Sequence, residues 1–216
     1  MSELKLRRQI IATALAMNEQ RINRGKSGNV SARIDGGFLV TPSALAYAAM
    51  RPADIVAMSA TGEAIGSRTP SSEWRFHRDI YDVRPEVQAI VHAHSSFATS
   101  LACLGRGIPP FHYMVAVAGG PDIRCAQYAT FGTQKLSDLA LKALDGRRAC
   151  LLANHGMIAV GSSLENALAL AVEVEALAEM YWRALQIGEP KPLSSAEMIV
   201  VLDKFRTYGE ARQADR

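Results

Sequence analysis

The chain has 216 residues, of which 49% are hydrophobic and 21% charged, and its formal net charge is +3 at pH 7. This composition is ordinary for a globular protein, and the length suits a single domain over residues 1–216. The basic excess is small and scattered, with no Lys/Arg block interleaved with aromatic residues, which argues against a nucleic-acid partner.

The cysteines and the N-terminus indicate the compartment. Cys103, Cys125 and Cys150 are widely spaced and form no C-x-x-C pair, which favours buried, reduced thiols over a disulfide framework. Residues 1–9 lack the apolar core of a signal peptide. No uninterrupted apolar run approaches the roughly 20 residues of a membrane helix. We therefore expect a soluble cytoplasmic protein with no membrane partner.

The first third of the chain predicts a helix followed by an antiparallel meander. Apolar residues recur at helical spacing over about residues 4–23, and two glycines within residues 25–29 end that helix. These glycines allow backbone amides to approach an anion, although a simple helix-to-strand connector is an equally good interpretation. Strands are expected over residues 30–34, 38–40, 55–58 and 63–66, with a hairpin turn at residues 35–37.

A second helix is expected after residues 71–72, where two serines precede apolar residues at helical spacing. We predict that this serine pair caps the helix and that Glu73 lies in the first turn, where the helix dipole favours a carboxylate. Two hydroxyls and free amides at a helix N-terminus suit an anion. On these residues alone we prefer the simpler interpretation, in which Ser72 only caps and Glu73 only answers the dipole.

The apolar run of residues 89–91 predicts a buried strand that leads into His92-Ala93-His94. Side chains alternate along a strand, so both imidazoles point to one face and supply two corners of a metal site. The elements expected next are a helix over about residues 97–104, a strand within residues 111–118, an aromatic loop over residues 126–133 and a helix over about residues 134–144.

His155 lies at a tight turn between two expected strands, residues 150–154 and 157–161. A lone histidine there is usually a hydrogen-bonded structural residue, and it gains interest only from the other two histidines. Helices over residues 164–187 and about 196–206 end the chain. These elements predict an α/β (α+β-like) fold with a mainly antiparallel central sheet flanked by helices. No G-x-G-x-x-G or P-loop is present, so a dinucleotide-binding fold is not expected.

The three histidines suggest a metal centre. An H-x-H pair with a distant histidine is the ligand set of an open catalytic zinc, with three protein nitrogens and one free position. No cysteine lies near His92, His94 or His155 in the sequence, which disfavours a closed structural zinc. Glu73 adds a base beside the anion site of residues 71–72. A metal, an anion pocket and a base together indicate chemistry on a small phosphorylated compound.

The motifs Ser71-Ser72-Glu73, His92-Ala93-His94 and His155-Gly156 resemble the class II aldolase/adducin family. Within it, the chain is most similar to the branch of L-fuculose-1-phosphate aldolases. The resemblance covers nearly the whole chain, which makes it far more specific than three histidines alone. It also rests on Gly28-Asn29 and on residues 112–114, 118–120, 128–133 and 204–209.

The resemblance implies a fold, an assembly and a site. The fold is an α/β sandwich, assembled as a homotetramer with active sites between subunits. Zinc is the implied cofactor, with Mn²⁺ or Co²⁺ as alternatives. Its implied ligands are His92, His94 and His155, and Glu73 joins them when no substrate is bound. Glu73 is also the implied acid/base. Tyr113 of a neighbouring subunit is the implied proton donor. The implied substrate-binding residues are Gly28, Asn29, Ser43, Ala44, Ser71 and Ser72 for phosphate, Lys26 beside it, and Phe131 and Tyr208 at the aldehyde end.

The reaction implied is retro-aldol cleavage of a ketose 1-phosphate to dihydroxyacetone phosphate and an aldehyde. Lys26, Ala44 and Asn154 depart from the family pattern but leave the metal and base residues intact. The sugar therefore stays open between L-fuculose 1-phosphate and a 5-deoxy- or 5-methylthio-pentulose 1-phosphate.

Other reactions remain as alternatives. A pentulose-phosphate 4-epimerase and a methylthioribulose-1-phosphate dehydratase belong to the same superfamily, and a Schiff-base aldolase would use a lysine such as Lys26. A non-catalytic, adducin-like scaffold is the least favoured, because Glu73 and the three histidines are all present.

Overall fold

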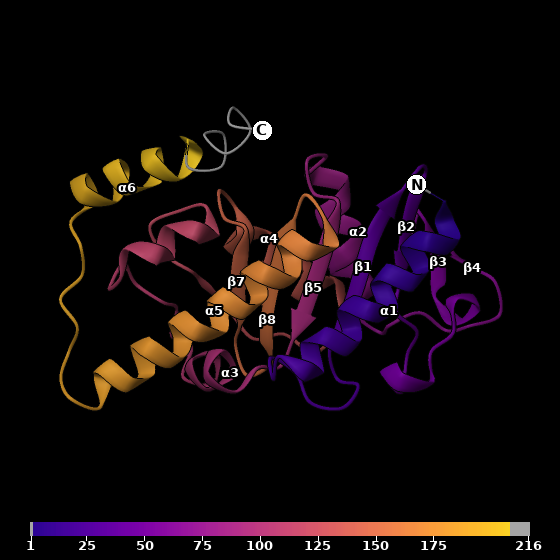
Figure 1. The fold of residues 1–216 in the computed structure, drawn as a ribbon, viewed down its shortest axis with the longest axis horizontal. Helices are drawn as coiled ribbons and strands as arrows, with labels where there is room; N and C mark the ends of the chain where they lie inside the picture. Colours follow the sequence, from indigo (N-terminus) through magenta and orange to yellow (C-terminus); the bar gives the residue numbers. More distant parts are fainter. Residues whose placement is uncertain (1, 208–216) are drawn as a thin grey trace, which may run out of the picture.

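The computed structural model describes residues 2–207, and an eight-stranded sheet forms the centre of that part of the chain (Figure 1). The strand order is β4-β3-β2-β1-β5-β8-β7-β6, and each neighbouring pair is antiparallel except β6 with β7. The expected mainly antiparallel sheet is therefore confirmed. The strands are β1 Asn29–Ile34, β2 Gly37–Val40, β3 Val56–Ser59, β4 Ala64–Ile65, β5 Ala89–Ala93, β6 Cys125–Ala126, β7 Ala149–Leu152 and β8 Gly156–Gly161.

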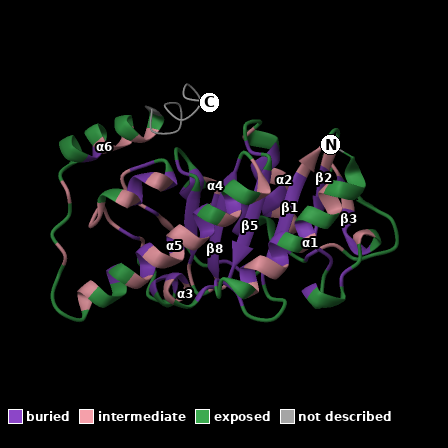
Figure 2. Ribbon diagram, viewed as in Figure 1, coloured by how far each residue is buried: buried purple, intermediate pink, exposed green. Residues whose placement is uncertain are grey.

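Helices cover both faces of this sheet. One face carries α1 (Glu3–Glu19), α3 (Ser96–Cys103) and α5 (Leu164–Leu185), and the other carries α2 (Trp74–Val83) and α4 (Gln134–Leu144) (Figure 1). Each face buries its own apolar cluster, and β5 supplies both, since Val91 points into one cluster and Ile90 into the other. Figure 2 shows buried strands between helices whose outer surfaces are exposed. This layering is the α/β sandwich that the family resemblance implies.

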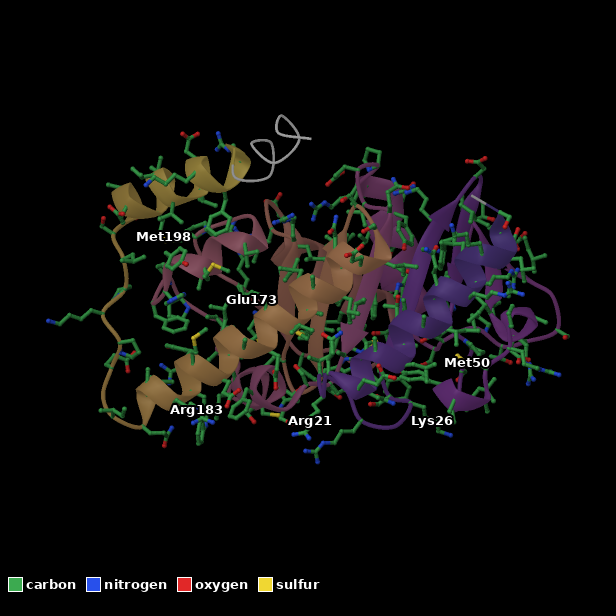
Figure 3. All side chains as sticks on the ribbon, in the orientation of Figure 1. Arg21, Lys26, Met50, Glu173, Arg183 and Met198 are labelled. Carbon is green, nitrogen blue, oxygen red and sulfur yellow. The ribbon has the colours of Figure 1, made fainter. Side chains whose placement is uncertain are left out.

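The last helix lies apart from the sandwich. α6 (Ser195–Thr207) follows a connecting segment, residues 186–194, and packs against the 3₁₀-helix η3 (Tyr113–Ala118) (Figure 1). Met198, labelled in Figure 3, is buried, whereas Ile199 and Val200 are exposed. Two further 3₁₀-helices, η1 (Tyr47–Ala49) and η2 (Pro52–Asp54), connect β2 to β3.

Most predicted boundaries agree with the observed ones, and the differences have local causes. The helix predicted over residues 134–144 is α4, with the same bounds. The first helix ends at Glu19 rather than near residue 23, because Arg21 adopts a left-handed φ of 61° that a helix cannot continue through. The long helix ends at Leu185, two residues before the predicted end.

The strand expected within residues 111–118 is wrong, because this segment forms η3. The His112 ring accepts a hydrogen bond from the Met114 amide (3.3 Å), which caps the first turn. At the other end Gly119, with a φ of 86°, donates its amide to Ala116 O (2.9 Å). A short apolar run does not distinguish a strand from a short helix by periodicity alone.

The predicted serine cap of α2 is also wrong. Glu73 occupies the N-cap position, and no side-chain cap hydrogen bond forms there. The Ser71 hydroxyl instead accepts from the Glu73 amide (3.3 Å), one residue before the helix starts. This turn buries Ser71 and Glu73 but leaves Ser72 exposed.

Glu175 of α5 closes the N-terminus of α3, just after the histidine pair. Its carboxylate accepts from the backbone amides of Phe97 (2.8 Å) and Ala98 (2.9 Å). We expect Glu175→Ala to lower the free energy of unfolding by about 1–3 kcal/mol, because two partly buried amides lose a charged acceptor. Urea unfolding measures this loss. Glu173→Ala, on the same helix (Figure 3), is the matched control, and equal effects of both variants would contradict the capping role.

Candidate metal centre and active site

Three imidazoles converge where β5 and the β7–β8 turn meet. His92 is in β5, His94 follows that strand, and His155 occupies the turn before β8. Antiparallel pairing of β5 with β8 sets Ala93 opposite Met157 and so brings the distant histidine to the pair. The ring centroids form a nearly equilateral triangle, with sides of 4.8, 4.9 and 4.9 Å. His155 therefore joins the predicted pair, His92 and His94, as a third candidate ligand.

Glu73 completes the cluster from the start of α2. Its Oε2 lies 3.1 Å from His92 Nε2, and its Oε1 lies 3.0 Å from His155 Nε2. Burial raises the pKa of the Glu73 carboxyl, but its interactions with the His92 and His155 imidazoles outweigh burial and hold the pKa far below its usual range. Glu73 is therefore an ionised carboxylate held among imidazoles.

The donor atoms of this cluster suit a divalent cation. One ligand atom from each of the four residues lies within 4.8 Å of the others. His92 Nδ1 lies 2.9 Å from the Met157 carbonyl, to which it donates, so its Nε2 lone pair faces His94 Nε2 at 3.0 Å. Ligand atoms around a tetrahedral zinc lie roughly 3.3 Å apart, close to the 3.0 Å of His92 Nε2–His94 Nε2 and to the 3.1 and 3.0 Å of the two Glu73–histidine pairs.

An orphaned atom supports the same conclusion. Glu73 Oε1 is buried and has no hydrogen-bond partner among the described residues, although His155 Nε2 is near. A buried carboxylate oxygen without a partner is unfavourable unless a cation or a substrate proton completes its surroundings. The four residues thus fit a bound metal ion.

Two glycines permit this close packing. A Cβ on Gly156 would lie 2.4 Å from Ala93 O and 2.9 Å from His94 Cδ2, so a side chain there would displace a metal-facing ring. A Cβ on Gly28 would lie 2.4 Å from His92 O. Gly28, proposed from the sequence as a phosphate residue, therefore also has a packing role against the histidine strand.

A cavity of about 250 Å³ opens on the cluster. Ser72, Glu73, His94 and His155 line it, which joins the expected anion residue to the expected metal site. Phe131, 65% exposed, lies on its wall. The sequence reasoning missed three further lining residues, Ser27, Tyr128 and Ala129; Asn154 also lines the cavity.

The remaining phosphate candidates lie on or near two segments, residues 41–44 and 69–71, that are joined by backbone hydrogen bonds. Ser43 N donates to Thr69 O and Ser71 N donates to Thr41 O, both at 3.0 Å, so Ser43 and Ser71 lie on neighbouring stretches. Lys26 Nζ donates to Ala44 O (2.9 Å), which joins two of the positions that depart from the family pattern. Ala44 has a φ of 60°, where glycine is favoured. Lys26 projects from the rim of the molecule (Figure 3).

Tyr113 does not reach the metal cavity of its own chain. It is 52% exposed and packs on Phe205 of α6, with ring centroids 6.5 Å apart. It lines a separate cavity of about 490 Å³ between η3 and α6. Any role at the metal therefore requires another copy of the chain. Tyr208, the other residue expected at the aldehyde end, lies outside the described residues.

Sequence reasoning also missed the buried polar residues that support the site. Asn23 Oδ1 accepts from the His94 amide (3.3 Å), and the Tyr47 hydroxyl donates to Gly28 O (2.5 Å). His77 contacts Asn29, which in turn contacts Glu73. The one available signal is a polar residue within an otherwise apolar helical face, as at His77.

Comparison with known proteins gives results consistent with this geometry. Residues 8–182 match the family model described as Class II Aldolase and Adducin N-terminal domain. The chain is similar to 5-methylthioribulose-1-phosphate/5-deoxyribulose-1-phosphate aldolase of Rhodospirillum rubrum, with 57% identity over 98% of this chain and 96% of that protein. It is 48% identical to L-fuculose phosphate aldolase of Escherichia coli K12, over 97% of this chain and 98% of the relative.

Solved structures agree. The fold matches an L-fuculose 1-phosphate aldolase with a TM-score of 0.91 and 40% identity, over 94% of this chain and 96% of that one. A structure titled YgbL from Klebsiella pneumoniae, a putative aldolase/epimerase/decarboxylase, matches with a TM-score of 0.83 and 31% identity, over 93% and 99% of the two chains. Within residues 2–207, no helix has the length and apolar character needed to cross a membrane.

Proposed function

The chain belongs to the class II aldolase and adducin family, and we propose that it catalyses metal-dependent retro-aldol cleavage of a ketose 1-phosphate to dihydroxyacetone phosphate and an aldehyde. The observation that carries this proposal is the cluster of Glu73 with three imidazoles at the cavity that Ser72 lines. Residues 1–216 act as one such domain. The enzyme is a carbon–carbon lyase, in agreement with the aldolase relatives.

His92, His94 and His155 would hold the metal, with zinc as the proposed ion and Mn²⁺ or Co²⁺ as substitutes. When bound, the ion supplies Lewis-acid stabilisation of the negative charge that develops on the ketose oxygens. Glu73 acts as the general acid/base. In condensation its carboxylate takes the proton from the carbon of dihydroxyacetone phosphate that becomes nucleophilic, and in cleavage it returns that proton to the same carbon.

The phosphate is proposed to bind at Gly28, Asn29, Ser43, Ala44, Ser71 and Ser72, with Lys26 adding positive charge. These residues offer hydroxyls and backbone amides, which orient a phosphate without taking part in the chemistry. Holding the phosphate and the metal end together fixes the carbon–carbon bond relative to Glu73. Phe131 and Tyr208 are proposed to shape the aldehyde end.

A 5-methylthio- or 5-deoxy-pentulose 1-phosphate is the substrate we favour, with L-fuculose 1-phosphate second. The 57% identical relative is named for the first pair of substrates. Tyr128 and Phe131, 59% and 65% exposed, face the cavity and offer apolar surface to a methyl or methylthio tail. L-fuculose 1-phosphate carries a hydroxyl near that end, for which this aromatic wall has less to offer.

The active form is proposed to be a cytoplasmic homotetramer. The exposed position of Tyr113, away from its own chain's metal cavity, supports this assembly, because a proton donor there can serve only a neighbouring copy. A phenol in that role would exchange a proton with the hydroxyl that becomes the aldehyde oxygen.

Product analysis tests the reaction type. The purified protein is incubated with 5-methylthioribulose, 5-deoxyribulose, L-fuculose and L-rhamnulose 1-phosphates, and dihydroxyacetone phosphate is measured by a coupled assay. We expect release from the first two substrates and slower release from L-fuculose 1-phosphate. An epimerised pentulose phosphate without free triose would indicate the 4-epimerase, loss of water the dehydratase, and unchanged substrates a non-catalytic scaffold; each outcome overturns the proposal.

A further inference from the structure

A buried chain of hydrogen bonds leads from Glu73 into the layer between α2 and the sheet. Glu73 Oε2 accepts from Asn29 Nδ2 (2.9 Å), and Asn29 Oδ1 lies 2.6 Å from His77 Nε2. His77 Nδ1 lies 2.7 Å from Ser31 Oγ, which lies 2.8 Å from the Tyr81 hydroxyl. All five residues are at least 95% buried. The four side chains behind Glu73 are therefore closed off from the metal cavity, which Glu73 itself lines. Each of their hydrogen bonds has to be satisfied from within the chain.

The charge on Glu73 sets the direction of every bond in this chain. An ionised carboxylate only accepts, so the Asn29 amide presents its NH₂ to Oε2 and its oxygen to His77. The Asn29 oxygen needs a donor, which places the His77 proton on Nε2. His77 Nδ1 then accepts from the Ser31 hydroxyl, and Ser31 Oγ accepts from Tyr81. One arrangement of protons satisfies all the members.

The surroundings of His77 keep it neutral and still. Burial lowers the pKa of His77 to about 3. The ring stacks on Phe76, with centroids 4.6 Å apart, and lies 6.5 Å from Phe38. A neutral, clamped ring keeps its proton on one nitrogen, which a freely rotating or charged ring would not do.

We infer that the chain Tyr81–Ser31–His77–Asn29 positions Glu73, holding Oε2 in place and leaving Oε1 as the oxygen that exchanges the proton with the substrate. This inference rests on the proposed function and adds to it the atom and the residues behind it. The two carboxylate oxygens are not equivalent, because Oε2 has an amide partner and Oε1 has none. His77, Ser31 and Tyr81 are positioning residues, since none of them lines the metal cavity.

Kinetics of substitutions in this chain test the inference. His77→Phe keeps the aromatic volume but removes the donor to Asn29; we expect kcat to fall about 10- to 100-fold, with KM and bound zinc per subunit unchanged. His77→Gln restores a donor near the same position and should recover most of the lost kcat. Unchanged kcat in His77→Phe, or a loss fully explained by missing zinc, would overturn the positioning role.

Ser31→Ala provides a second test that remains usable if the His77→Phe protein does not fold. It removes only the hydroxyl that selects the His77 tautomer, and we expect kcat to fall roughly 3- to 10-fold, less than after loss of the donor itself. Ser137→Ala is the matched control, because Ser137 is also fully buried and hydrogen-bonded but belongs to α4. Equal kcat for the two serine variants would contradict the inference.

Nitrogen-15 NMR of the histidines gives a measurement that does not depend on turnover. With the zinc-loaded protein at pH 7, we expect His77 as the neutral tautomer protonated on Nε2. A proton on Nδ1, or a charged ring, would overturn the direction assigned to the chain. If wild-type protein releases no dihydroxyacetone phosphate from any of the four substrates, the proposed function fails, whereas the tautomer measurement still decides the direction of the hydrogen bonds.

Discussion

Replacing Glu73 with glutamine is expected to lower kcat for cleavage by about 10³-fold, within the range for loss of a general acid/base. Glutamine keeps the size of the side chain, and its carbonyl can still accept from Asn29 Nδ2. His92, His94 and His155 remain, so bound zinc should stay at the wild-type level. Steady-state kinetics with metal analysis of the same preparation separates loss of the base from loss of the metal.

Glu63→Gln provides the control, because Glu63 is an exposed carboxylate on the meander, away from the metal cavity. Its kcat should match that of the wild type. Turnover of Glu73→Gln near the wild-type rate would remove Glu73 from the proton transfer, whereas simultaneous loss of zinc would assign it mainly to metal binding.

Replacing Tyr113 with phenylalanine is expected to lower kcat by about 10²-fold with little effect on stability. The ring stays against Phe205, and only an exposed hydroxyl is removed. A second experiment mixes subunits of the Tyr113→Phe and Glu73→Gln variants and measures the activity of the mixed tetramers. If the active sites lie between subunits, some sites of the mixed tetramers combine an intact Glu73 with an intact Tyr113, and activity should recover above that of either variant.

Mixed tetramers without recovered activity would contradict the assignment of Tyr113 to a neighbouring site. The comparison requires that the subunits exchange, which can be confirmed by tagging one variant. Tyr181→Phe is the matched tyrosine control. The Tyr181 hydroxyl accepts from Arg106 and lines neither the metal cavity nor the cavity between η3 and α6.

Local patterns predicted much of this fold. The helix over residues 134–144 was predicted with its observed bounds, because a polar start and an apolar stripe are readable within one segment. The H-x-H pair placed two imidazoles on one face for the same reason. The role of His155 needed more, since the pairing of β5 with β8 is a long-range contact that no local period contains. The family resemblance supplied that link.

The supporting residues could not be predicted, because they depend on register across the sheet and between layers. Asn29 meets His92 only through the β1–β5 pairing, and His77 meets Asn29 only when α2 packs on the sheet. Glu175 reaches α3 from a helix more than seventy residues later in the sequence. The serine pair misled for a related reason, since the turn before α2 moved the cap position to Glu73.

Metal dependence of cleavage tests the central claim most directly. The protein is stripped with a chelator and dialysed, and dihydroxyacetone phosphate release from 5-methylthioribulose 1-phosphate is measured before stripping, after it, and after zinc is restored. We expect release to fall to background and to return with about one zinc per subunit, because the three imidazoles provide one three-nitrogen site. Release at the full rate from metal-free protein would contradict the account, and borohydride trapping of a lysine adduct would then indicate a Schiff-base aldolase.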